Sequence, residues 1–192
     1  FLTQEDTLSL PKIDSYTRNM LEDLEITKET VYKKLCKLNP SKSPGPDGLH
    51  PKVLFEIRDE ILEPLTIIFN DSIKSGILPQ DWKDANITAL FKKGNKRKPN
   101  NYRPVSLTSI ICKLLESIER DHIVNFMNVN KLFSKCQFGF LSGRSTSYQL
   151  LKALDAWTEI RDRGGNIDTI YFDFMKAFDT VPHERMLLKL QS

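Results

Sequence analysis

The run Ile170-Tyr171-Phe172-Asp173-Phe174-Met175 places one carboxylate inside an otherwise apolar stretch. β-Branched and aromatic residues are dense over residues 167–174, which predicts a strand there. Burying a carboxylate costs several kcal/mol unless the group is paired or binds a metal. We therefore expect Asp173 at the end of this strand, facing an open cleft. There it either binds a metal ion or acts locally, as an N-cap or a half-exposed edge residue.

Composition places the chain among ordinary globular domains. The 192 residues suffice for one domain or part of a larger one. An apolar fraction of 40% and a net charge of +3 argue against disorder. No apolar run approaches the ~20 residues of a membrane helix, and the N-terminal sequence FLTQEDTLSL is not a signal peptide. Three scattered cysteines predict free thiols in an intracellular protein, in the cytoplasm or nucleus and not secreted. Because the chain starts at Phe1 and stops within a helical pattern, we expect a fragment.

Apolar spacing predicts a helix-rich α+β fold. Helices are expected at residues 27–38, 50–75, 108–127 and 145–161. Thr27, Thr108 and Ser145 are the expected N-caps, and Gly76 should end the second helix. Pro64 should kink or split that second helix.

Each helix carries an apolar stripe that should pack in a core. In the fourth helix the stripe consists of Leu150, Leu151, Leu154 and Trp157. Alternating residues over 84–91 predict a strand.

Residues 91–103, FKKGNKRKPNNYR, hold six bases and no acid. Gly, Asn and Pro in this stretch predict a loop rather than a helix. Such a loop is either a solvated surface loop or a mobile loop that binds phosphates or nucleic acid.

Four blocks of the sequence together resemble the reverse transcriptase domain of non-LTR retrotransposons, of the LINE type and most closely the jockey-like elements. Residues 173–183, DFMKAFDTVPH, are similar to motif A. The other blocks occur in the family's order, namely SPGPDG at 43–48, WK at 82–83 through LFKKG at 90–94 with NYRPVSL at 101–107, and QFGF at 137–140 with GRST at 143–146. An ordered series of blocks is far more specific than motif A alone.

The resemblance implies RNA-directed DNA polymerase ancestry on a right-hand fold. Residues 1–39 are then an unassigned helical extension, residues 40–165 the fingers and start of the palm, and residues 166–192 the first palm strand with motif A and the following helix. No YxDD block occurs, so we expect an incomplete palm sheet and a chain that is inactive alone. The implied partners are an RNA template, a DNA primer and deoxynucleoside triphosphates, without a membrane. The alternative is a non-catalytic nucleic-acid-binding remnant of a retroelement.

The resemblance also assigns the chemistry of motif A. Asp173 is the catalytic carboxylate, and it shares the two Mg²⁺ ions of the intact enzyme with the backbone carbonyl of Phe174. Phe178 matches a steric gate against ribonucleotides, the alternative being a core aromatic residue. The backbone of Ala177 is expected beside the triphosphate, and Asp179 is expected to hydrogen-bond locally.

The resemblance further implies that residues 84–92 and 102–107 form a fingers hairpin around the basic loop, with Lys92 and Arg103 on the same side, and that this hairpin binds the triphosphate. Lys92 and Arg103 match fingers residues that grip it, with Lys93 as an alternative to Lys92. Three residues are expected near the template strand, namely Gly139, Gly143 and Arg144. Gly143 serves equally well in the turn before the helix at Ser145.

Overall fold

The computed structural model describes residues 19–174, 177–178 and 180–191. These residues divide into two compact units. The hairpin unit comprises residues 21–126, and the C-terminal unit comprises the other described residues, chiefly those from 127 onward. No helix within the described ranges is long and apolar enough to cross a membrane.

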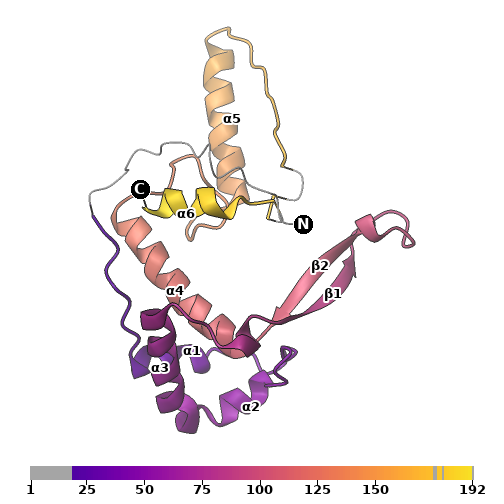
Figure 1. The fold of residues 1–192 in the computed structure, drawn as a ribbon. Coiled ribbons are helices and arrows are strands. Elements are labelled where there is room, and N and C mark those ends of the chain that lie inside the picture. Colours follow the sequence, from indigo (N-terminus) through magenta and orange to yellow (C-terminus); the bar gives the residue numbers. More distant parts are fainter. Residues whose placement is uncertain (1–18, 175–176, 179, 192) are drawn as a thin grey trace. The chain divides into compact units, whose positions relative to one another are not determined.

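Both units are rich in helix (Figure 1). The hairpin unit contains α1 Lys28–Leu35, α2 Pro51–Glu56, α3 Arg58–Ser75, the 3₁₀ turn η2 Gln80–Trp82, β1 Ala85–Phe91, the 3₁₀ turn η3 Pro99–Asn101, β2 Tyr102–Thr108 and most of α4 Ile110–Val129. The C-terminal unit contains the end of α4, α5 Thr146–Asp162 and α6 His183–Gln191. The sheet of the described residues is the antiparallel pair β1–β2. The predicted helix-rich α+β class is confirmed, whereas the assignment to fingers and palm stays a prediction.

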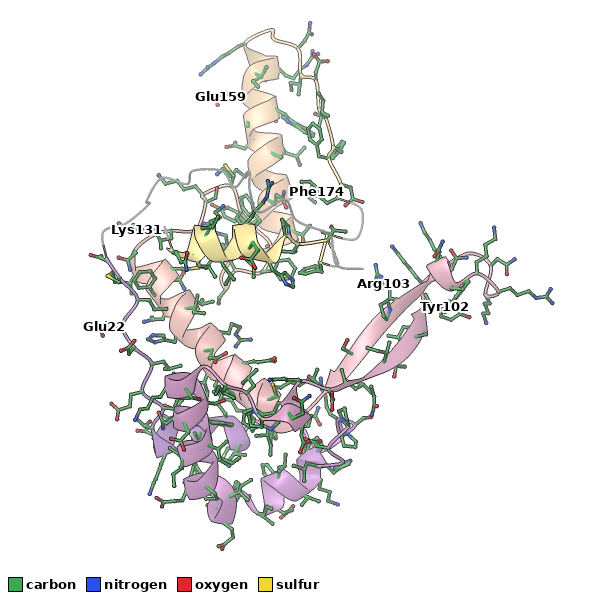
Figure 2. All side chains as sticks on the ribbon, in the orientation of Figure 1. Glu22, Tyr102, Arg103, Lys131, Glu159 and Phe174 are labelled. Atoms are coloured by element: carbon green, nitrogen blue, oxygen red, sulfur yellow. The ribbon has the colours of Figure 1, made fainter. Side chains whose placement is uncertain are left out.

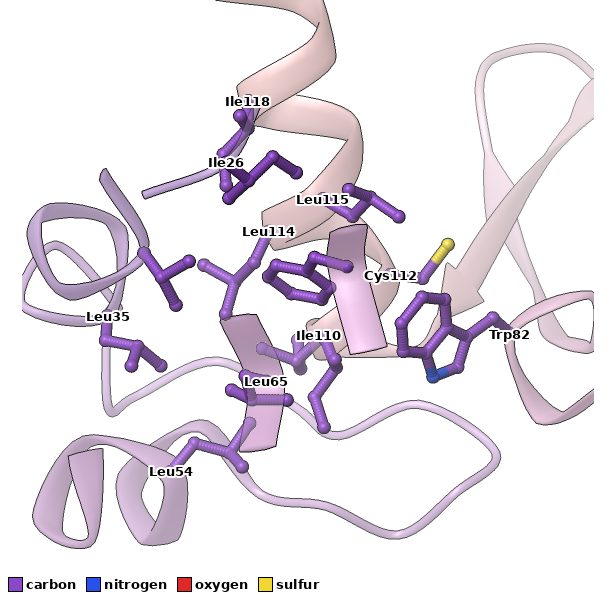
Figure 3. Close-up of a cluster of buried hydrophobic side chains, with 13 residues drawn as sticks. Ile26, Leu35, Leu54, Leu65, Trp82, Ile110, Cys112, Leu114, Leu115 and Ile118 are labelled. Carbon is purple, nitrogen blue, oxygen red and sulfur yellow. The ribbon is translucent and has the colours of Figure 1, made fainter. Parts of the chain in front are cut away.

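A cluster of buried apolar side chains holds the hairpin unit together (Figure 3). Its members are Ile26, Val31, Leu35, Leu54, Leu65, Phe69, Trp82, Ile110, Ile111, Cys112, Leu114, Leu115 and Ile118. The ring of Phe69 is fully buried and meets Trp82 edge to face, with centroids 5.8 Å apart. Each such side chain contributes about 1.5–3 kcal/mol when fully buried, so this cluster is the main source of the unit's stability.

The segment before α1 is part of the same core. The Ile26 backbone N–H donates to Asn70 Oδ1 at 2.9 Å, and Asn70 Nδ2 donates back to the Ile26 carbonyl at 2.8 Å. On α1, Lys34 Nζ contacts Asp121 Oδ2 of α4 at 2.5 Å and donates to the Ser117 carbonyl at 3.1 Å. Residues 26–35, from the extension that the sequence left unassigned, thus pack with α3 and α4.

The first two helical predictions hold except at the proline. Thr27 Oγ1 accepts from the Thr30 N–H at 3.2 Å and caps α1, and Gly76, with φ of 66°, ends α3. The expected split at Pro64 is wrong, because the interruption lies at Ile57 and α3 continues through the proline. An interior proline costs about 3 kcal/mol, and the burial of Leu65 and Phe69 in the following turns of α3 offsets that cost.

The third helix begins one residue later than predicted. Thr108 belongs to β2, where it pairs with Ala85. Ser109 is buried and takes the capping role, since its Oγ accepts from the Cys112 N–H at 3.4 Å. The predicted core stripe of this helix is confirmed, with Ile111, Leu114, Leu115 and Ile118 all buried.

The C-terminal unit departs more from the predictions. Ser145 caps α5 as expected, its Oγ accepting from the Tyr148 N–H at 3.1 Å. The predicted core stripe of α5 is wrong, because the helix has no buried residue and Leu151 is 64% exposed. The predicted strand at residues 167–174 is also wrong, since this segment has no strand pairing. A strand needs a hydrogen-bonded neighbour, and no other described segment pairs with this one.

Candidate nucleotide and nucleic-acid interface

The strands β1 and β2 form the predicted hairpin around the basic loop. Their register runs from Ala85 opposite Thr108 to Phe91 opposite Tyr102, and it sets Leu90 opposite Arg103. The hairpin projects away from the helices of its own unit (Figure 1). All seven residues of β1 are exposed, so neither face of the hairpin serves the core.

The register places Lys92 and Arg103 on one face. The Lys92 N–H donates to the Asn101 carbonyl at 2.8 Å, which continues the ladder by one pair beyond β1. Because side chains alternate along a strand, Lys92 follows Leu90 onto the face that carries Arg103. Lys92 and Arg103 are then diagonal neighbours across the hairpin, close enough for their long side chains to reach one ligand. The register supports the predicted same-side arrangement, which stays a prediction, and it sets Lys93 on the alternate position.

Hydrogen bonds within the basic loop close it into a compact turn. Asn101 Nδ2 donates to the Asn95 carbonyl at 2.8 Å, and the Arg97 N–H donates to Asn95 Oδ1 at 2.9 Å. Gly94 has φ of 88°, a left-handed conformation that glycine adopts without strain. The backbone of the loop is therefore ordered, and it holds the basic side chains at the end of the hairpin.

The basic side chains of the hairpin are exposed and carry unneutralised charge. They are Lys92, Lys93, Lys96, Arg97, Lys98 and Arg103. Among the described residues none of these six forms an ion pair with a carboxylate. Clustered free cations attract phosphate groups, so the hairpin can bind a polyanion.

The other face of the hairpin carries an aromatic pair that the sequence analysis missed. Phe91 and Tyr102 are directly opposite, and their rings meet edge to face with centroids 5.5 Å apart. Figure 2 shows Tyr102 beside Arg103 on β2, and successive strand residues point to opposite faces. The sequence feature that could have revealed this pair is the loop length, because it fixes the register of the two strands. Neither strand alone indicates the pair.

Motif A lies in the C-terminal unit, and several of its described residues are exposed. Asp173 is exposed but does not end a strand, so the predicted strand end is wrong, and its position in a cleft stays a prediction. Phe174 is 82% exposed, and Ala177 and Phe178 lie in a turn. Phe178 is 81% exposed and meets Phe140 edge to face at 6.1 Å, so the core alternative for Phe178 is wrong.

Residues 175–176 and 179 of motif A lie outside the described residues. The expected local hydrogen bond of Asp179 therefore stays a prediction. Lys92 and Arg103 belong to the other compact unit.

The three expected template residues lie between α4 and α5. Arg144 Nη1 donates to the carbonyls of Ser134, at 3.1 Å, and Lys135, at 3.2 Å, and also to that of Gln137. Arg144 therefore holds its own loop together. Gly143 has φ of 75°, which fits the turn role left open for it. Gly139 has no atom within 4 Å of a Cβ position, so its backbone is open to a ligand.

The oxygen ligands at motif A fit Mg²⁺ in kind and are too few in number. A carboxylate and a backbone carbonyl are ligands that Mg²⁺ accepts, but each ion needs several oxygens. Over the described ranges no three His, Cys, Asp or Glu side chains gather into a possible metal site. Asp173 and Phe174 by themselves therefore offer too few ligands for the two-metal centre that the resemblance implies.

A cavity of about 310 Å³ lies elsewhere, between residues 21–24 and the helices α3 and α4. His122 Nε2 donates to the Glu22 carbonyl at 2.8 Å beside it. Burial, with the nearby Glu116, raises the pKa of Glu119 on the cavity wall. None of the predicted site residues lines this cavity.

Comparison with known proteins decides the family. Residues 91–192, from the end of β1 through motif A, match the family described as reverse transcriptase (RNA-dependent DNA polymerase). This chain belongs to the reverse transcriptase family. The predicted resemblance to jockey-like non-LTR elements is confirmed by its relatives.

The chain is 30% identical, over 165 residues and 85% of its length, to the RNA-directed DNA polymerase from mobile element jockey of Drosophila melanogaster. It is 26% identical over 190 residues, 98% of its length, to the probable RNA-directed DNA polymerase from transposon BS of the same organism. It is 28% identical over 194 aligned residues, 97% of its length, to the Pol polyprotein of the type-1 element R1 of Bradysia coprophila. The chain spans 18%, 21% and 18% of these three relatives, so it corresponds to about a fifth of each.

Proposed function

We propose that this chain is the fingers and first palm segment of an RNA-directed DNA polymerase from a jockey-like non-LTR retroelement. In this proposal the hairpin unit binds the incoming deoxynucleoside triphosphate, and motif A supplies one carboxylate of the catalytic centre. The intact parent copies an RNA template onto a DNA primer, and the 192 residues alone are inactive.

The observation that carries the proposal is the charged face of the hairpin. Lys92 and Arg103 are diagonal neighbours, both exposed, and no carboxylate among the described residues neutralises either. A triphosphate carries several negative charges, and the planar guanidinium of Arg103 can bind two of its oxygens at once. Because the alternation sets Lys93 on the other side, the proposal favours Lys92 over Lys93.

Motif A supplies the remaining chemistry. Asp173 and the Phe174 carbonyl would hold Mg²⁺ together with carboxylates outside the described residues. Two metal ions, when bound, stabilise the attacking 3′ oxygen and the leaving pyrophosphate. The Phe178 ring, exposed rather than buried, is free to lie under the sugar and exclude a 2′-hydroxyl. The backbone N–H of Ala177 lies in the same turn and donates to the nucleotide.

Residues near the template complete the proposal. The open backbone at Gly139 admits a nucleic-acid strand, and Gly143 with Arg144 shapes the loop beside it. Such a polymerase acts inside the cell, in the cytoplasm or nucleus, where its RNA template occurs.

A second candidate is a non-catalytic nucleic-acid-binding remnant. It is favoured by the hairpin, whose cationic side chains need no motif A, and by the lack of a clustered metal site in the described part. The two candidates differ in one requirement, because only the polymerase needs Asp173.

The first experiment measures triphosphate binding by the 192-residue chain, using a fluorescent deoxynucleoside triphosphate. Lys92→Ala and Arg103→Ala should each weaken binding about three- to tenfold, the range for an exposed charge-assisted contact. Lys93→Ala tests the alternative lysine and should change binding less. Lys52→Ala, on α2 and exposed, is the matched charge control. Equal weakening by all four variants would show unspecific electrostatics and refute the triphosphate site.

The second experiment tests Asp173 in the full-length parent. Asp173→Ala should abolish primer extension on an RNA template and leave salt-sensitive RNA binding nearly intact. The isolated chain should give no extension. Retained synthesis by the Asp173→Ala parent would refute the role of motif A, and an inactive wild-type parent that still binds RNA would favour the remnant.

A further inference from the structure

We propose that Phe91 and Tyr102 form a stacking platform for an unpaired base of a single-stranded RNA. The platform lies on the hairpin face opposite Lys92 and Arg103. It deepens the proposed function, since it gives the hairpin a second ligand, the template strand, on its second face.

The position of the two rings is unusual for a purely structural pair. They lie at the end of the hairpin, on the same face as Ile87, where no core covers them. Phe91 remains 41% exposed despite its contact with Tyr102. A cross-strand aromatic pair stabilises a hairpin, but it does so without needing an exposed ring face.

The neighbouring groups hold the pair in place and add charge beside it. Tyr102 Oη donates to the Lys96 carbonyl at 2.9 Å, which ties the ring to the basic loop. Lys96 Nζ lies over the Phe91 ring, 5.5 Å from its centroid, so a base that stacks on that face displaces the ammonium toward its phosphate. A phosphate next to a stacked base would therefore meet an ammonium group close to the platform.

These features select the ligand. Every base has a flat π-face, so aromatic side chains bind bases with little sequence preference, and a cationic groove binds the backbone. The hairpin residues 91–103 carry six bases and no acid, which complements a polyanion. A duplex keeps its bases stacked on each other, whereas a single strand can offer one to the platform. The occupant is thus a single strand, which under the proposed function is the RNA template, and duplex RNA is the negative comparison.

The test uses the 192-residue chain and a short RNA that contains 2-aminopurine, whose fluorescence is quenched by stacking. Phe91→Leu and Tyr102→Leu keep apolar side chains across the strands and remove one ring each. Each should weaken single-strand binding by about 5- to 150-fold, which corresponds to the 1–3 kcal/mol of one stacked base. Each should also reduce the quenching, while the salt dependence of binding stays unchanged because no cation is removed.

Two variants control for folding. Ile87→Ala removes an exposed apolar side chain from the same strand and face, away from the pair, and should leave RNA binding unchanged. Tyr102→Phe keeps both rings, loses only the hydroxyl, and should retain the quenching. Hydrogen exchange of the β2 amides reports whether the hairpin persists in each variant.

The outcomes separate this proposal from the triphosphate site. Quenching and affinity that survive in both leucine variants would overturn the platform while triphosphate binding stands. Equal losses on single strand and duplex would overturn it too, as would tighter binding of the DNA strand than of the RNA strand. Loss of RNA stacking in Phe91→Leu with unchanged triphosphate binding would support both sites. If the chain stacks RNA bases but binds no triphosphate, that result would refute the proposed triphosphate site and leave the platform standing.

Discussion

Replacing Gly45 by alanine should destabilise the root of the hairpin. Gly45 is buried in the turn at residues 43–48, and a Cβ there would lie 2.6 Å from the Thr108 carbonyl oxygen and 2.8 Å from the Ser109 nitrogen. These atoms are backbone at the junction of β2 and α4, so no side chain can rotate away. Gly45 is thus required for space, whereas Gly48 is required for its φ of 68° and has nothing within 4 Å.

The magnitude follows from the size of the clash. Ordinary contact begins at 3.4 Å, so the turn or the junction must move by about 0.8 Å. Overpacking of this kind costs about 1–3 kcal/mol, a sizeable share of a typical 5–15 kcal/mol stability. A two-stranded hairpin is marginal by itself, so a displaced root should also loosen β1 and β2. We expect the midpoint of thermal unfolding of the 192-residue chain to fall by about 2–4 °C for each kcal/mol.

Thermal unfolding followed by circular dichroism measures the effect, and hydrogen exchange of β2 measures the loosening. Gly139→Ala is the matched control, because its Cβ would have no atom within 4 Å and its φ is not left-handed. The Gly139→Ala control should unfold at the same midpoint temperature as the wild type. If Gly45→Ala also melts with the wild type and β2 keeps its protection, the close packing of the turn against the β2–α4 junction is refuted.

Two further predictions concern the hairpin unit and the free thiols. Burial raises the pKa of Cys112 to about 11, whereas Cys36 and Cys136 are exposed. Iodoacetamide should therefore modify Cys36 and Cys136 first and Cys112 only on unfolding. Mass spectrometry with and without denaturant measures this order. The Lys34 ammonium lowers the pKa of Asp121 below its usual 3.8, so their ion pair stabilises the fold above about pH 4 and is lost as the pH falls through the lowered pKa. Lys34→Met should therefore lower the free energy of unfolding by about 0.5–1 kcal/mol at neutral pH, and a difference in urea unfolding that persists unchanged below pH 3 would contradict this.

Features with local causes could be predicted from the sequence. The caps at Thr27 and Ser145 and the glycine end at Gly76 depend on residues within one turn of helix. Alternation over 84–91 predicted the first strand of the hairpin, whereas the second strand was expected from the family resemblance, and the structure pairs the two. From the hairpin and its loop length, the shared face of Lys92 and Arg103 follows.

Features that depend on distant partners could not be predicted. The break at Ile57 instead of Pro64 reflects how Leu65 and Phe69 are buried, which the pattern of one helix does not reveal. The binding of Arg144 to backbone carbonyls depends on how residues 134–137 fold back onto it. The sequence showed a cation near a glycine and gave no sign that its guanidinium was already engaged.

The two wrong predictions in the C-terminal unit share one physical cause. The run at residues 167–174 has strand composition without a paired strand, and the stripe on α5 has core composition without a core. A strand in a sheet satisfies its backbone by pairing, and its side chains offer an apolar face against which an amphipathic helix can pack. Under the proposed function, strands of the intact palm beside residues 167–174 would satisfy both needs at once. Asp173 would then end a paired strand, the rigid position from which a carboxylate can hold a metal ion. Under the proposed function the sequence patterns at residues 167–174 and on α5 would describe the assembled polymerase, whereas the hairpin unit of this chain has a buried core of its own beside its cationic loop.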